Sequence, residues 1–183
     1  LNTQGIQGGI VQMINHGIVT GALFLCIGII YERTHTRQIA DYGGAATVLP
    51  VYAAFFMVLT LASIGLPGTN GFVGEFLILL GGFTASKTLG ALAALGVIIG
   101  AAYMLRLYQR VFFMDVNPKI QGLRDMDLRE LLTLAPLIVL IFWIGVYPAP
   151  VMNFTDASVQ RLVERLNTAG QPRVAQHEGE VAK

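Results

Sequence analysis

Four long apolar stretches constrain the fold of this chain more than any other feature of its sequence. They cover about residues 8–31, 49–83, 89–113 and 131–147. A helix needs roughly 17 to 25 residues to cross the hydrocarbon core of a bilayer, so each stretch is long enough to span it. Strands are excluded because an open sheet leaves unpaired edges in lipid, and the alternation of an outer-membrane barrel is missing. The sequence therefore predicts an all-α, polytopic transmembrane helix bundle with four spans.

Charged residues are kept out of these stretches. They make up 13% of the chain, about half of the roughly 25% found in soluble domains. We expect the lipid bilayer as a partner and no nucleic acid, because the net charge is only +1 and basic residues do not interleave with aromatic ones. The single cysteine, Cys26, permits neither an internal disulfide nor a cysteine-ligated metal site, so we expect no cofactor in this chain.

The second stretch is too long to be one straight helix. At 1.5 Å per residue, residues 51–83 would extend over roughly 50 Å, against a hydrocarbon core of about 30 Å. Its middle carries four residues that disfavour helix: Gly65, Pro67, Gly68 and Gly71. We predict two half-helices, 51–64 and 71–83, joined by irregular backbone, which a membrane tolerates only where it is buried in protein or lines a wet cavity. A simple proline kink is the alternative.

Glu75 is the strongest candidate for chemistry, because ionisable side chains inside spans are costly and usually functional. It follows the break by four residues, which would place it in the first turn of the second half-helix, near mid-membrane. Unpaired amides there stabilise the carboxylate, whereas burial stabilises the protonated acid. These opposed effects suit a carboxyl that loads and unloads a proton near neutral pH. A permanently protonated or paired structural glutamate is the alternative.

Three further residues are candidates for a proton path. His16 lies early in the first span, where its imidazole suits either a proton relay or a hydrogen bond between packed helices. Thr60 and Ser63 precede the break one helical turn apart, and their hydroxyls would either hold water or bond back to their own helix. The sequence leaves both alternatives open.

Two weaker patterns concern packing. Gly17 with Gly21, and Gly96 with Gly100, match the small-residue spacing that lets transmembrane helices approach closely. Aromatic residues suited to an interfacial belt are Tyr103, Tyr108, Trp143 and Tyr147.

The distribution of Lys and Arg predicts the orientation in the membrane. Loops 32–48 and 114–130 are basic, whereas the loop on the opposite side carries only Lys87. By the positive-inside rule both basic loops are cytoplasmic, and the termini lie on the other side. Residues 1–9 lack the charged region and cleavage site of a signal peptide, and we interpret them as a loop left by truncation.

The pattern changes after residue 150. Four apolar residues recur at helical spacing, opposite polar ones: Val159, Leu162, Val163 and Leu166. This predicts a short interfacial helix, followed from about residue 168 by a loose polar tail. We therefore divide the chain into a transmembrane part, 1–150, and a C-terminal part, 151–183.

One motif resembles a known family. The segment SIGLPGTNGFVGEF at 63–76 resembles the broken-helix signature of the antiporter-like, Mrp-related proton-translocating subunits of respiratory complex I, an NADH-quinone oxidoreductase, and is closest to the subunit M family. The segments QMINHG at 12–17 and YERTHTR at 31–37 look like the family's preceding helix and its cytoplasmic loop. The resemblance covers about residues 1–150.

The resemblance implies a role for each candidate residue. Glu75 would be the key ionisable residue of the second half-channel, on its exit side, and His16 would belong to the hydrated relay that leads to it. The four spans would be the last helices of an antiporter-like fold in a bacterial inner membrane. The other membrane-arm subunits would be partners, with NADH, FMN, iron-sulfur clusters and quinone bound to partner subunits.

The sequence is also compatible with other functions. The sister subunits and the related sodium/proton antiporter subunits usually have lysine where Glu75 stands, so the glutamate favours a complex I subunit. The alternatives are a subunit of a related cation/proton antiporter or membrane-bound hydrogenase, and a purely structural membrane module.

Overall fold

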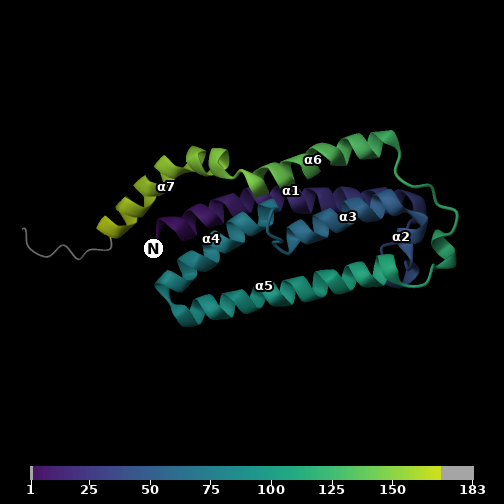
Figure 1. Ribbon diagram of the computed structural model, residues 1–183, viewed down its shortest axis with the longest axis horizontal. Helices are drawn as coiled ribbons and strands as arrows, with labels where there is room; N and C mark the ends of the chain where they lie inside the picture. Colours follow the sequence, from purple (N-terminus) through teal and green to yellow (C-terminus); the bar gives the residue numbers. More distant parts are fainter. Residues whose placement is uncertain (1, 170–183) are drawn as a thin grey trace, which may run out of the picture.

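The computed structural model describes residues 2–169, and in this part of the chain every regular element is helical. The long helices lie side by side in an elongated bundle, with the N-terminus and α7 at one end and the short α2 at the other (Figure 1). In chain order the elements are α1 (Thr3–Thr34), η1 (Ile39–Asp41), α2 (Ala45–Val48), α3 (Pro50–Ser63), α4 (Asn70–Ala85), α5 (Lys87–Tyr108), the π-helical η2 (Gln109–Phe113), η3 (Pro118–Ile120), α6 (Leu128–Val146) and α7 (Ala149–Ala169).

The lengths of these helices confirm the predicted all-α membrane bundle. Within residues 2–169, three segments are long and apolar enough to cross a bilayer: Thr3–Thr34, Lys87–Phe113 and Leu128–Val146. The apolar helices α3 and α4 are each shorter and follow one another end to end (Figure 1). Together they form the predicted broken span.

The break between α3 and α4 follows from the residues that the sequence places there. Gly65 and Gly68 have φ angles of 71° and 92°, a region that side-chain-bearing residues rarely adopt. A Cβ atom on Gly71 would collide with the carbonyl oxygen of Ala62, so this glycine lets the two half-helices meet. From α6, Gly145 packs against the backbone of Gly68 and Thr69. The irregular backbone is therefore partly covered by a neighbouring helix.

The first helix begins earlier than expected. The segment 1–9 was interpreted as a loop, but α1 starts at Thr3. The side chain of Asn2 caps it by accepting a hydrogen bond from the Gly5 N–H at 2.8 Å, which satisfies one of the free amides of the first turn. The Asn2 amide also donates to the Gly81 carbonyl at 2.8 Å, which ties the start of α1 to the end of α4.

Close helix contact occurs at glycines other than those predicted. Among the described residues, a Cβ atom on Gly17, Gly21 or Gly96 would meet nothing within 4 Å, and on Gly100 only the Tyr103 ring. Instead α1 packs tightly on α4. A Cβ atom at any of three glycines would collide with the facing helix: Gly8, Gly74 and Gly81. These contacts form what we call the α1–α4 seam.

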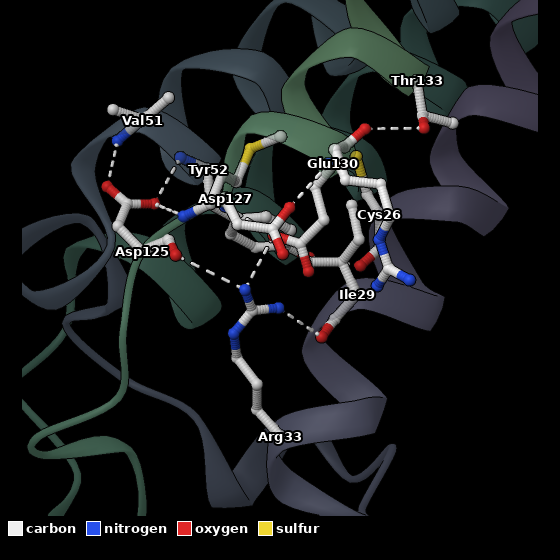
Figure 2. Close-up of polar contacts among 11 residues, drawn as sticks. Cys26, Ile29, Arg33, Val51, Tyr52, Asp125, Asp127, Glu130 and Thr133 are labelled. Carbon is white, nitrogen blue, oxygen red and sulfur yellow. Dashed lines mark hydrogen bonds and ion pairs between the residues drawn. The ribbon is translucent and has the colours of Figure 1, made fainter.

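A polar clamp holds the helices together at the α2 end of the bundle (Figure 2). Arg33, near the end of α1, donates to Glu130 at the start of α6 at 2.7 Å. Glu130 also completes a capping box with Asp127. The side chain of Asp125 accepts from the free N–H groups of Val51 and Tyr52 at 2.8 and 3.1 Å, which caps α3. The short segment 125–130 thus fixes the end of α1 and the starts of α3 and α6.

The aromatic core lies beside this clamp. Four aromatic side chains pack against one another between α3 and the α5–η2 helix: Tyr52, Phe56, Tyr108 and Phe112. The rings of Tyr108 and Phe112 are only 4.3 Å apart, and the Tyr108 hydroxyl donates to the Ala53 carbonyl at 3.0 Å. Tyr108 is therefore a buried core residue, and its assignment to an interfacial belt was wrong.

The C-terminal helix is longer than predicted. α7 begins at Ala149, directly after α6, and extends to Ala169, whereas only a short helix was expected. Val159 and Val163 are buried on the expected apolar face, and the Gln7 amide of α1 donates to the Met152 carbonyl at 3.1 Å. Thr168, placed in the loose tail, is helical, and the rest of that predicted tail, from residue 170, lies outside the described residues.

Candidate functional site

Glu75 lies on α4, close to the break between α3 and α4. Its carboxyl is held between the backbone of the break and a side chain of α1. A Cβ atom on Gly65 would collide with Glu75 Oε2, so the carboxyl rests directly against the backbone of the break. On the other side, the Gln12 side chain of α1 donates to Glu75 Oε1 at 3.4 Å. The carboxyl is half-buried and so is partly shielded from its surroundings.

The position of Glu75 along α4 differs slightly from the prediction. Because α4 begins at Asn70, Glu75 lies in the second helical turn, and its placement in the first turn was wrong. The electrostatic effect of a helix end falls off within one turn, so it acts on Glu75 less than expected. The contacts with Gln12 and with the break dominate its local surroundings.

An open pocket of about 430 Å³ lies beside Glu75. Its walls are Ser63 and Ile64 at the end of α3 and a face of α5 that is rich in small residues. That face includes Gly96 and Gly100, whose spacing predicted close helix packing. Tyr103 lines the same wall. The small residues therefore leave space beside the carboxyl instead of bringing two helices together.

A larger pocket lies elsewhere and offers little chemistry. It measures about 540 Å³ and is lined mainly by apolar residues of α1, α3 and α5, towards the α2 end. Arg37 lies at this pocket with its guanidinium 4.7 Å from the centre of the Tyr31 ring. Because an acid and a hydroxyl meet at the smaller pocket, that pocket is the better candidate site.

The other predicted relay residues differ in their surroundings. His16 is exposed, and its Nδ1 lies 3.2 Å from the Thr20 hydroxyl. It is one helical turn beyond Gln12 on α1 and makes no direct bond to Glu75 among the described contacts. Thr60 is fully buried, and its hydroxyl donates to the Phe56 carbonyl of its own helix at 2.8 Å. Ser63 lines the pocket with Glu75.

Sequence reasoning missed a group of carboxamides beside the break. Asn15 and Asn70 are buried, and the side-chain amide of Asn15 donates to the main-chain carbonyl of Asn70 at 2.6 Å. Buried side-chain atoms of Gln12, Asn15 and Asn70 lack hydrogen-bond partners among residues 2–169. Polar uncharged residues in apolar stretches could have indicated this group, because each needs hydrogen-bond partners inside the membrane. In the same part of the chain, no three His, Cys, Asp or Glu side chains gather as a metal site would require.

The sequence is similar to a known family of membrane proteins. A model of the NADH:quinone oxidoreductase/Mrp antiporter transmembrane family matches residues 1–100, which include the break, Glu75 and His16. The chain belongs to this family. Within the NADH:quinone oxidoreductase/Mrp antiporter family, it is 49% identical over 164 residues to NADH-quinone oxidoreductase subunit M of Rhodobacter capsulatus, covering 89% of this chain and 32% of that protein.

Two further similarities extend this result. The chain is 46% identical to NADH-ubiquinone oxidoreductase chain 4 of Marchantia polymorpha, over 90% of this chain and 33% of that protein. It therefore spans about a third of the length of these relatives. Among solved structures, respiratory complex I from Thermus thermophilus with bound NADH contains a chain with a TM-score of 0.77 and 39% identity, over 86% of this chain and 34% of that one.

A second solved structure shares the same fold. The membrane-bound sulfane sulfur reductase, an archaeal respiratory membrane complex, contains a chain with a TM-score of 0.77 and 28% identity, over 83% of this chain and 25% of that one. The family membership and the long apolar helices together identify the chain as part of an integral, multi-pass membrane protein. The resemblance to the subunit M family, noted from residues 63–76, is confirmed.

Proposed function

We propose that this chain is a proton-translocating part of an NADH:quinone oxidoreductase subunit, and that Glu75 carries the proton. The observation that carries the proposal is the geometry around Glu75. An acid in a membrane helix lies at a helix break, between a carboxamide of α1 and an open pocket beside α5. Intramembrane acids at such breaks suit ion and proton paths. The similarity to subunit M proteins supports the same activity.

In this proposal Glu75 receives a proton from the α1 side and releases it into the pocket beside α5. His16 belongs to the approach on α1, with water bridging the distance to the acid, because no direct bond joins the two side chains. Ser63 is the hydroxyl that receives water at the pocket. Thr60 contributes less than the sequence suggests, since its hydroxyl is already bonded within α3. The break residues Gly65, Pro67, Gly68 and Gly71 keep this path open.

The proposal assigns redox chemistry to other chains. NADH oxidation and quinone reduction, with their FMN and iron-sulfur clusters, belong to partner subunits of the complex, and the membrane-arm subunits are the direct neighbours of this chain. We place loops 32–48 and 114–130 on the cytoplasmic side of a bacterial inner membrane. Residues 1–150 form the transmembrane part, and α7, which begins at Ala149 and continues into the C-terminal part 151–183, lies at the opposite membrane surface.

Substitution of Glu75 tests the proposal directly. In the full complex, Glu75→Gln keeps the size of the side chain but cannot titrate, so NADH-driven proton uptake by membrane vesicles should fall by at least about tenfold. Glu75→Asp retains an acid and should keep appreciable activity. A native gel verifies assembly. The matched control is Glu32→Gln, an exposed glutamate at the α2 end of α1. Wild-type pumping by an assembled Glu75→Gln complex would exclude the relay role and favour a structural membrane module.

The archaeal sulfane sulfur reductase match supports one alternative, a subunit of a different respiratory complex with the same fold. An ion-dependence measurement separates this alternative and a cation antiporter from the main proposal. Proton uptake driven by NADH and independent of sodium supports the proposal. Uptake that requires a sodium gradient, or that NADH does not drive in the native membrane, supports the alternatives.

A further inference from the structure

Among residues 2–169, the carboxyl of Glu75 has one side-chain hydrogen-bond partner, Gln12, which lies far from it in sequence. We propose that Gln12 is a positioning residue, whose carboxamide holds the Glu75 carboxyl against the break in both of its protonation states. This inference rests on the proposed function of Glu75. It concerns a residue that lies four positions before the predicted relay histidine and that was not itself predicted to take part.

The α1–α4 seam fixes the place of the Gln12 side chain. A Cβ atom on Gly74 would collide with Gln12 Oε1 and would approach Gln12 Cα and Cβ within 2.9 Å. The glycine that directly precedes Glu75 therefore makes the space in which the carboxamide lies. Tight contacts at Gly8 and Gly81 flank this point along the same seam. Because both helix backbones are held together here, the carboxamide has little freedom to move away from Glu75.

The two oxygens of Glu75 meet different neighbours. Oε2 faces the backbone at Gly65, and Oε1 accepts a hydrogen bond from Gln12 Nε2, with 3.4 Å between the nitrogen and the oxygen. Gly65 and Gln12 therefore border the carboxyl on two sides, while the pocket beside α5 remains open to it. A carboxyl bordered in this way keeps a fixed direction toward the pocket.

A carboxamide suits both forms of a titrating acid. Its NH₂ group donates to the ionised carboxylate, and its oxygen can accept the proton of the neutral acid after a rotation of the terminal amide. Gln12 Oε1 is buried and has no hydrogen-bond partner among the described residues, so this acceptor is not committed elsewhere. An apolar side chain of the same size would offer neither interaction and would favour the neutral acid.

The test uses Gln12→Met, which nearly conserves volume and removes both the donor and the acceptor. Dicyclohexylcarbodiimide reacts with protonated carboxyls in apolar surroundings, and mass spectrometry of the intact, assembled complex measures its adduct on Glu75. Loss of the donor should increase the rate of Glu75 modification by about three- to tenfold. Gln4→Met is the matched control, an exposed glutamine on the same helix. Glu130, paired with Arg33, is the internal reference carboxyl.

A second variant guards against loss of assembly. Gln12→Asn stays polar, but its shorter side chain should not reach Glu75, so it should increase modification as Gln12→Met does. Faster modification in both assembled variants, with Gln4→Met unchanged, supports the positioning role. If proton uptake survives despite faster modification, Gln12 positions Glu75 without limiting transport, and proton uptake by the Glu75→Gln complex remains the separate test of the proposed relay. Unchanged modification in an assembled Gln12 variant overturns the inference, whatever happens to pumping.

Discussion

Glu130 takes part in two interactions that a single substitution can separate. Its carboxylate accepts from the Asp127 N–H in the capping box and from Arg33 at 2.7 Å. Glutamine can still complete the box but removes the negative charge that Arg33 faces, and both side chains of this pair are largely buried. We expect Glu130→Gln to lower the free energy of unfolding by about 1–3 kcal/mol. The measurement is the thermal unfolding midpoint of the detergent-solubilised complex.

The exposed pair of Lys119 with Asp41 provides the comparison. Lys119 donates to Asp41 at 2.6 Å, and this bond, followed by one from Thr36, lowers the pKa of the Asp41 carboxyl. The contribution of a carboxyl with a lowered pKa is present above its ordinary pKa and is lost as the pH falls through the lowered value. Solvent screens such a pair, so Asp41→Asn should shift the unfolding midpoint much less than Glu130→Gln at neutral pH. Equal shifts would contradict a special role for the buried pair.

The small-residue face of α5 leads to a prediction about the pocket beside Glu75. A larger side chain at Gly96 or Gly100 would meet almost nothing among the described residues, so it can extend into the space beside the acid. We expect Gly96→Leu and Gly100→Leu to reduce NADH-driven proton uptake several-fold while the complex still assembles, because water is displaced from the path. Ala91→Leu, on the same helix but away from the pocket, is the control. Pumping at control levels in both variants would exclude the pocket as a water path.

The broken span was predictable, but the α1–α4 seam was not. The break rests on residues whose backbone preferences are local, and Gly65 and Gly68 indeed adopt positive φ angles. Which glycines face another helix depends on the rotation of each helix about its axis, and that rotation is set by tertiary packing. The spacing of Gly17 and Gly21 therefore matched the motif, but these glycines make no close helix contact within residues 2–169, whereas Gly74 does.

The candidate site shows the same limit. Glu75 was evident because an acid in an apolar stretch is unusual at any rotation of its helix. Its partner Gln12 is 63 positions away in the chain, and nothing local pairs the two. His16 was equally conspicuous, yet it bonds only to Thr20 of its own helix among the described contacts. Composition thus identifies which residues are costly in a membrane, and packing decides which of them meet.

At the scale of the whole molecule, two loops far apart in sequence form one end of the bundle. Asn117 bonds to the Gly43 carbonyl through its N–H and to the Ala40 carbonyl through its side chain, both at 3.2 Å, and Lys119 pairs with Asp41. The loops predicted to share one side of the membrane therefore lie together (Figure 1). The turn between α4 and α5, after which α5 begins at Lys87, lies at the other end (Figure 1).

The positive-inside rule assigns this joined end to the cytoplasm, and labelling of introduced cysteines tests the assignment. In intact cells, cysteines at Thr36 and Gln121 should resist a membrane-impermeant maleimide, whereas a cysteine at Lys87 should react. The native Cys26 is fully buried and should give little background. Labelling in opened membranes verifies that the protected positions are reactive. Reaction at Thr36 and Gln121 with protection at Lys87 would reverse the orientation. It would also reverse the direction of proton release from Glu75, because the same helices carry the acid and the two loops.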